Sequence, residues 1–266
     1  MQLVEYARFV AIGDSQTEGL GDPDPRYEFR GWADRLADRL AQINPEVRYA
    51  NLAVRGKRTR QVLDDQLAPA LALNPDLVAA PLGMNDVIGR GDLAEVHTDL
   101  DHIYGRLAET GATVIVSTFP DVVRTIPLAT RMEDRLLTLN AMMREFADQY
   151  GFVLVDLYSA PVLTDLRAWS VDRLHASPFG HERFADGAAH ALGLPGSSAD
   201  WGTPIDPTPQ PHPVAAVIRD TRWAVQFFTP WLIRKVRGVS LGDGRAPKRP
   251  ELTPVLGPLT PDPAAS

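Results

Sequence analysis

Cysteine is absent from the 266 residues of this chain. The absence excludes a disulfide framework, thiolate chemistry and zinc sites built on cysteine ligands. It suits a reducing compartment, and we expect the protein to be cytoplasmic. The six histidines also lack the spacing of metal ligands, so we predict neither a metal nor a cofactor.

Long apolar runs are missing as well. The run at residues 9–12 is too short for a signal sequence or a membrane span, and no basic segment precedes it. A later apolar stretch, residues 223–233, is interrupted by Gln226, Thr229 and Pro230. We therefore expect no targeting segment and no membrane span.

Basic charge is scarce, because 27 Lys and Arg stand against 34 Asp and Glu, which gives a formal net charge of −7. This balance argues against a general nucleic-acid-binding protein. The glycine-rich patterns that bind nucleotide phosphates, Gly-x-Gly-x-x-Gly and Gly-x-x-x-x-Gly-Lys-Ser/Thr, are absent too. The partner that we expect is a small molecule.

Short apolar runs alternate with longer segments of helical periodicity. The runs predict strands at residues 9–12, 47–52, 76–80, 113–118 and 152–157. The periodic segments predict helices at residues 31–43, 59–73, 93–109, 131–150 and 178–192, with the second kinked or split at Pro69. Apolar strands separated by helices are typical of a parallel sheet covered on both faces, so we predict a three-layer α/β/α fold.

The composition changes near Pro195. We predict one main domain over residues 1–194, a linker rich in Pro, Ser and Gly at 195–213, an appended amphipathic helix at 214–238 and a Pro-rich tail at 239–266. The appended helix has few polar positions and would not stay exposed in a monomer. Three explanations stay open for it: packing on the main domain, a homodimer contact, or a weak contact with a membrane surface.

A serine follows the first predicted strand, in the run Gly13-Asp14-Ser15. Reactive groups of parallel sheets gather at the carboxyl ends of the strands. Ser15 there can attack through its Oγ and donate its own backbone N–H to a developing oxyanion. Capping of the next helix by Asp14 or Ser15 explains the same residues equally well.

A serine nucleophile needs a base, and neutral imidazole held by an orienting acid is the usual one. Asp172 and His175 stand three residues apart in one predicted loop. Gly56 and Asn85 follow two other strands and offer amide donors for an oxyanion, although turn chemistry explains each of them alone. Together with Ser15 these residues supply what an acyl-transfer site requires.

The sequence resembles the SGNH hydrolases, also called the GDSL esterase/lipase family, over about residues 7–192. The resemblance is carried by Ile12-Gly-Asp-Ser-Gln-Thr-Glu-Gly19, Asn51-Leu-Ala-Val-Arg-Gly-Lys-Arg-Thr59, Leu82-Gly-Met-Asn-Asp86, Asp172-Arg-Leu-His175 and Ser177-Pro-Phe-Gly-His181. The first block departs from many members of the family, which carry Leu where this chain has Gln16. The resemblance implies a flavodoxin-like sheet of five parallel strands, followed here by a C-terminal helical extension.

The resemblance also implies a role for each site residue. Ser15 would be the nucleophile, and His175, oriented by Asp172, would be its base. Ser15, Gly56 and Asn85 would form the oxyanion hole, with no metal. We therefore expect a serine esterase that cleaves small to medium acyl esters through an acyl-Ser15 intermediate.

Six neighbours of these motifs are candidates for lining the substrate pocket: Asp14, Asp86, Phe119, Pro120, Trp169 and Leu174. The apolar ones follow the fourth strand or flank the Asp–His loop, where packing in the core explains them as well. The two acidic ones stand next to a proposed site residue, where turn formation or helix capping explains them.

Other functions remain open on the same residues. The same site chemistry serves a carbohydrate O-deacetylase, a thioesterase, a lysophospholipase or an acyltransferase. A catalytically silent binding module is the alternative outside enzymes. The complete set of Ser15, Asn85, Asp172 and His175 argues against it.

Overall fold

The computed structural model describes residues 5–126, 129–206, 218, 220–228, 242 and 244–255. The rest of the predicted linker, appended helix and tail lies outside the described residues: 207–217, 219, 229–241, 243 and 256–266. Within the described part of the chain, no helix is both long and apolar enough to cross a membrane.

A six-stranded sheet forms the centre of the molecule, in the order β7-β6-β5-β1-β4-β8. Its strands are β1 Arg8–Ala11, β4 Arg48–Asn51, β5 Leu77–Ala79, β6 Thr113–Ser117, β7 Val153–Val155 and β8 Arg249–Pro254. The first five pair in parallel, and β8 pairs antiparallel with β4. Strands β1, β5 and β6 are almost wholly buried, because helices cover both faces of a parallel sheet.

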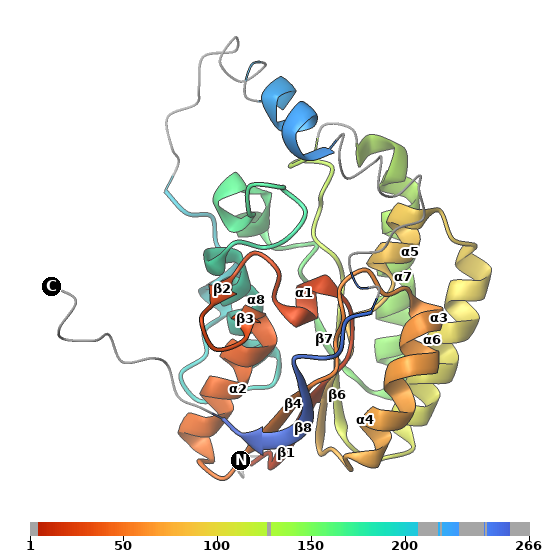
Figure 1. Ribbon diagram of the computed structural model, residues 1–266, viewed down its shortest axis with the longest axis vertical. Coiled ribbons are helices and arrows are strands. Elements are labelled where there is room, and N and C mark those ends of the chain that lie inside the picture. Colours follow the sequence, from red (N-terminus) through yellow and green to blue (C-terminus); the bar gives the residue numbers. More distant parts are fainter. Residues whose placement is uncertain are drawn as a thin grey trace, which may run out of the picture.

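Helices form one layer on each side of the sheet (Figure 1). One layer contains α2 Gly31–Ile43 and α8 Pro178–Ala191. The other contains α3 Thr59–Val62, α4 Ala68–Ala72, α6 Leu93–Ala108 and α7 Glu133–Tyr150. The predicted three-layer α/β/α fold with five parallel strands is confirmed.

Short elements occupy the connections between the strands and the long helices. They are α1 Ser15–Glu18, β2 Pro23–Asp24, β3 Glu28–Phe29, α5 Met84–Gly89, η2 Ala129–Met132, η3 Pro161–Thr164, η4 Leu166–Ala168, η5 Ala199–Gly202 and η6 Ala224–Phe228. Several of the site residues predicted from the sequence lie in or beside these short elements.

The helix predicted at residues 59–73 is interrupted in the structure. A five-residue π-helical stretch, η1 Leu63–Leu67, separates α3 from α4, and Pro69 lies in the first turn of α4. Proline has no N–H and its ring crowds the carbonyl four residues earlier, so the turn before it widens. The widened turn contains Gln66, which reaches the site described below.

Strand β8 was not predicted, because its sequence contains Pro250 and Pro254 and lies in a Pro-rich region. Proline is tolerated at the edge of a sheet, where β8 lies. The guanidinium of Arg249 lies 4.8 Å from the ring centre of Tyr49 in β4. The neighbouring Lys248 is buried, and its Nζ donates to Asp34 of α2 at 2.6 Å. These contacts fasten the C-terminal strand to the main domain.

An aromatic cluster fills the core beneath α6 and α7. The ring of Tyr104 makes edge contacts with Phe146 at 5.3 Å and with Phe152 at 5.8 Å. Its hydroxyl donates to the carbonyl of Ala80 at 2.9 Å, just beyond the end of β5. Truncating a buried aromatic of this kind costs about 3–5 kcal/mol of stability. The cluster supports the segment that leads into α5.

Candidate active site

Ser15 lies at the start of α1, in a turn that follows β1; we call residues 13–15 the nucleophile turn. Gly13 has φ 148°, and a Cβ there would lie 2.8 Å from Thr17 Oγ1, so the turn requires glycine. The side-chain amide of Gln66 brackets Gly13, accepting from its N–H at 2.8 Å and donating to its carbonyl at 2.9 Å. The turn is therefore fixed from both sides before any substrate binds.

His175 comes from a tight hairpin between β7 and α8; we call residues 169–176 the base loop. Trp169 and Ala176 form an antiparallel bridge at its base. The N–H of Ser170 donates to the His175 carbonyl at 2.8 Å. At the tip, Arg173 adopts a left-handed conformation with φ 59°. Asp172 and His175 thus lie on either side of a sharp reversal of the backbone.

The Asp172 carboxylate accepts four hydrogen bonds. Its Oδ1 accepts from Ser170 Oγ at 2.7 Å and from the N–H groups of Leu174 and His175 at 2.9 and 3.0 Å. Its Oδ2 lies 2.7 Å from His175 Nδ1. Burial acts to raise the pKa of Asp172, but the hydrogen bonds and charge of His175, with the bond from Ser170, bring it well below its ordinary value. Asp172 is therefore an anion at neutral pH.

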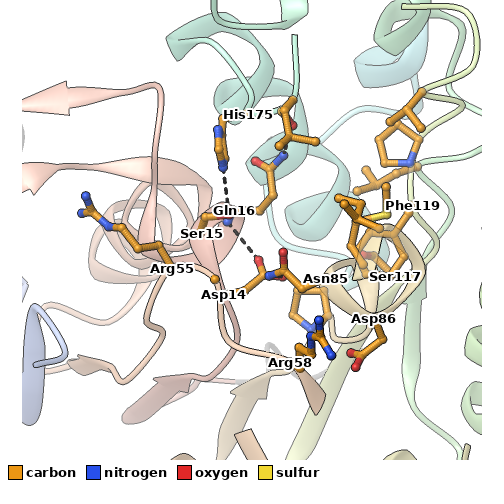
Figure 2. Close-up of a pocket in the computed structure, with 18 of the residues that line it drawn as sticks. Asp14, Ser15, Gln16, Arg55, Arg58, Asn85, Asp86, Ser117, Phe119 and His175 are labelled. Carbon is orange, nitrogen blue, oxygen red and sulfur yellow. Dashed lines mark hydrogen bonds between the residues drawn. The ribbon is translucent and has the colours of Figure 1, made fainter. Parts of the chain in front are cut away.

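His175 connects this carboxylate to the serine. Its Nδ1 faces Asp172. Its Nε2 lies 2.9 Å from Ser15 Oγ, and Figure 2 shows His175 pointing toward Ser15. A carboxylate at Nδ1 fixes the proton there and leaves Nε2 as a hydrogen-bond acceptor. The arrangement can remove the Ser15 hydroxyl proton and stabilise the imidazolium that results.

Three amide groups face the space beside Ser15. Within the described residues, the backbone N–H groups of Ser15 and Gly56 donate to no acceptor. The side-chain amide of Asn85, in α5, donates to Asp14 Oδ2 at 2.9 Å and to the Lys57 carbonyl at 3.0 Å. The two backbone groups are free for a ligand oxygen, whereas Asn85 reaches one only by sharing a hydrogen.

Asp14 is buried between Ser15 and Asn85. Its Oδ1 accepts from the Gln16 N–H at 3.1 Å, and its Oδ2 accepts from Asn85. Burial raises the pKa of Asp14 to about 6, although the Gln16 hydrogen bond and the charge of His175 oppose the rise. A second carboxyl group, which titrates near neutral pH, therefore lies beside the proposed nucleophile.

A cavity of about 630 Å³ opens at this point. The proposed residues Ser15, Gly56, Asn85 and His175 line it, and so do the six predicted pocket residues Asp14, Asp86, Phe119, Pro120, Trp169 and Leu174. In Figure 2, Phe119 lies across the cavity from Ser15 and His175. The structure thus gathers these residues, predicted from five separate segments, around a single cavity.

Two of the pocket candidates also have structural contacts. Asp86 accepts from the N–H and the hydroxyl of Thr59 at 3.0 and 2.8 Å, which ties α5 to the start of α3. The indole N–H of Trp169 donates to the Leu163 carbonyl at 2.8 Å.

Within the described residues, no group of three or more His, Asp or Glu is placed to hold a metal ion.

The sequence analysis missed the side chains that join the three loops. Gln16 Nε2 donates to the Leu174 carbonyl at 2.9 Å, which links the nucleophile turn to the base loop. Glu18 accepts from the N–H of Arg55 at 2.6 Å and from its Nε at 2.9 Å, which links α1 to the residue before Gly56. Gln16, Glu18 and Arg55 lie within the motif blocks around Ser15 and Gly56, but nothing in those blocks indicates which segments their side chains join.

Comparisons with known proteins agree with this architecture. Residues 11–183 match the model of the GDSL-like Lipase/Acylhydrolase family. No curated protein sequence matches the chain.

Solved structures of similar fold include LAE5, an alpha/beta hydrolase enzyme from the metagenome of Lake Arreo, Spain. LAE5 is 25% identical, with a TM-score of 0.58 over 70% of this chain and 95% of LAE5. Axe2, an acetylxylan esterase from Geobacillus stearothermophilus, is 21% identical. Its TM-score is 0.61, and the match covers 73% of this chain and 97% of Axe2. The acetyl xylan esterase AlAXEase is 18% identical. Its TM-score is 0.58, and the match covers 69% of this chain and 98% of AlAXEase.

Proposed function

The chain belongs to the GDSL-like lipase/acylhydrolase family and is a serine hydrolase of ester bonds; on that premise we propose that it cleaves small to medium acyl esters through an acyl-Ser15 intermediate. One observation carries the proposal. An unbroken hydrogen-bonded chain runs from the Asp172 carboxylate through both nitrogens of His175 to Ser15 Oγ.

The first half-reaction follows from these distances. His175 Nε2 takes the proton of Ser15 as Oγ attacks the acyl carbonyl, and Asp172 stabilises the imidazolium. The oxyanion accepts from the N–H groups of Ser15 and Gly56 and shares a hydrogen with Asn85. When the tetrahedral intermediate collapses, the leaving alkoxide takes the proton from His175 and departs as an alcohol.

The second half-reaction repeats these steps with water. His175 removes a proton from water, which attacks the acyl-Ser15 carbonyl, and the same donors hold the second oxyanion. Collapse returns the proton to Ser15 Oγ and releases the carboxylic acid. One water is consumed and both protons are accounted for, so the cycle needs no co-reactant other than water.

The lining of the cavity supports an ester with an apolar side. Apolar side chains in β6 and in the loop after it contribute to the lining, among them Val116, Phe119 and Val122. All three are buried and apolar. An acyl chain placed there would gain roughly 0.8 kcal/mol for each methylene buried.

A p-nitrophenyl ester series, from acetyl to palmitoyl, tests the proposal with wild type, Ser15→Ala and the control Ser198→Ala. Ser198 is an exposed cap of η5. We expect Ser15→Ala to lose about a thousandfold or more in kcat/KM and Ser198→Ala to match wild type. Equal turnover by wild type and Ser15→Ala would refute Ser15 as the nucleophile.

Removal of acetyl groups from carbohydrates is a second candidate. Charged side chains line another part of the cavity, including Arg58, Asp92 and Glu95, and polar groups of this kind suit sugar hydroxyls. Axe2 and AlAXEase are by name acetyl xylan esterases. A higher kcat/KM on acetylated xylo-oligosaccharides than on p-nitrophenyl acetate would favour this candidate; the reverse order would favour the simple ester.

A further inference from the structure

The family match ends at residue 183, yet the chain returns to the site beyond that point. The described parts of this return are residues 220–228, 242 and 244–255, which we call the C-terminal segment. In Figure 1 its helical part, drawn in blue, lies beyond the carboxyl ends of the strands, and β8 lies beside β4. The C-terminal segment contacts two of the loops that form the proposed site.

Its first contact is with the tip of the base loop. The guanidinium of Arg173 lies 4.8 Å from the ring centre of Trp223, and its Nη2 lies 2.7 Å from Asp220 Oδ1. Arg173 and Trp223 are both buried. A buried cation that is stacked on an indole and paired with a partly exposed carboxylate is held more firmly than the same cation on an open surface.

The backbone conformation of Arg173 links this contact to the position of Asp172. A left-handed conformation is unfavourable for any residue with a Cβ, so φ 59° persists only where surrounding contacts enforce it. Arg173 follows Asp172 directly, and its N–H donates to the Ser170 carbonyl at 2.9 Å. Rotation of the tip would therefore move Asp172 and, through it, the ring of His175.

A second contact reaches the loop that presents Gly56, residues 54–57, which we call the oxyanion loop. A Cβ at Gly242 would lie 2.0 Å from the Arg55 carbonyl oxygen, so only glycine allows this approach. Arg245 Nη1 lies 2.9 Å from Glu28 Oε2, and Glu28 in turn pairs with Arg55. The C-terminal segment thus packs directly against the residue before Gly56.

The far end of the C-terminal segment is anchored in the main domain. Lys248 Nζ donates to the carbonyls of Phe29 and Arg30 at 3.0 and 2.7 Å, as well as to Asp34. Burial lowers the pKa of Lys248 and raises that of Asp34 to about 6. The anchor and β8 fix the part of the C-terminal segment that follows Gly242, next to the oxyanion loop.

We propose that the C-terminal segment positions the catalytic loops: Asp220 and Trp223 hold the base loop through Arg173, and Gly242 holds the oxyanion loop through Arg55. These are positioning residues, because their contacts with the site are with Arg173 and Arg55 and not with Ser15 or His175. The proposal rests on the proposed function, since it concerns the geometry of that site. A displacement of about 1 Å at reacting groups can cost on the order of a hundredfold in rate.

The first test compares Asp220→Asn with the control Arg222→Gln, an exposed residue of the same helix. Circular dichroism and thermal melting establish that each variant is folded. We expect Asp220→Asn to lower kcat about tenfold with KM almost unchanged, and Arg222→Gln to match wild type. Wild-type kcat in Asp220→Asn would overturn the positioning of the base loop.

A double-mutant cycle separates positioning from loss of stability. Arg173→Met removes both the Asp220 pair and the Trp223 contact, so it should lower kcat at least as much as Asp220→Asn does. The double variant should fall no further than Arg173→Met, because the Asp220 pair is already lost. Arg173→Lys keeps the cation and should recover most of the lost kcat. Additive losses in the double variant, or no recovery by lysine, would contradict a shared contact.

Gly242→Ala tests the second contact independently of the first. The added Cβ must push the Arg55 carbonyl away, so we expect kcat to fall several-fold while the melting temperature changes little. Unchanged kcat in folded Gly242→Ala would remove the oxyanion loop from the proposal. Failure of the proposed function is distinguishable, because it leaves Ser15→Ala as active as wild type, whereas failure here leaves Ser15→Ala inactive and Asp220→Asn normal.

Discussion

The nucleophile turn and the base loop each bring one aspartate to the same serine–histidine pair, but the pKa values of the two carboxyl groups are shifted in opposite directions. Asp172 accepts hydrogen bonds from Ser170 Oγ, two backbone N–H groups and His175, and its pKa is held well below the ordinary value. Asp14 accepts from one backbone N–H and from Asn85, and burial raises its pKa to about 6.

The difference shows that burial alone does not set the role of a carboxyl group. Burial acts to raise the pKa in both cases, and the donors around Asp172 outweigh it. Asp172 is therefore suited to stabilise a positive charge on His175 throughout the neutral range. Asp14 has fewer donors, and its ionisation is costly to the fold.

Of the substitutions at the two aspartates and their partners, removal of the Asp172 charge should lower kcat the most. Asp172→Asn replaces the acceptor of His175 Nδ1–H and favours the wrong tautomer of the ring. We expect kcat to fall by about 10⁴, which is the scale for an orienting carboxylate. Steady-state kinetics on a p-nitrophenyl ester measure it, with Asp165→Asn as the control, since Asp165 caps η4 and pairs with Arg167. A loss of less than tenfold would mean that Asp172 is not the orienting acid.

Removal of Asn85 comes next, because it takes one amide from the proposed oxyanion hole. For Asn85→Ala we expect kcat to fall about 10²–10³-fold with little change in KM. The matched control is Asn44→Ala, whose amide donates to the Tyr6 carbonyl at 2.9 Å away from the cavity. If both variants lose the same activity, the loss in Asn85→Ala reflects stability and not the oxyanion.

The smallest effect is on stability and concerns Asp14. Its carboxyl has a pKa of about 6 in the fold against an ordinary 3.8, so the native state holds the proton more tightly than the unfolded chain. Stability from this group is fully present below about pH 4 and is lost as the pH rises through about 6, by up to about 3 kcal/mol.

Asp14→Asn cannot ionise and should escape this loss. The free energy of unfolding of Asp14→Asn minus that of wild type should rise between pH 4 and pH 7, as measured by urea denaturation. The hydrogen bond that the amide cannot replace lowers stability equally at both pH values and cancels in the comparison. A difference independent of pH would show that Asp14 has an ordinary pKa in the fold.

Much of the fold was predictable because the signals for it are local. Apolar runs at residues 9–12, 76–80 and 113–118 carry their strand tendency in their own side chains. The broken helix at Pro69 is local as well, because proline acts on its own turn. Strand β8 was not predictable, since Arg249 and its neighbours form a strand only where β4 offers an open edge.

The candidate site divides in the same way. Ser15 and Asn85 were predicted because each stands in a short motif after a strand, and Asp172 and His175 because they stand three residues apart in one loop. Gln66 was missed, because nothing in its own segment indicates that it brackets Gly13, 53 residues away.

The sequence by itself determined the five parallel strands and the long helices and marked the side chains proposed for the chemistry, because hydrophobic periodicity and residue type act over a few positions. The tertiary structure alone decided the raised pKa of Asp14, the sixth strand and the pairing of Arg173 with Asp220, 47 residues apart. Desolvation and hydrogen bonding depend on what lies next to a group in space, and the chain brings those neighbours from distant positions.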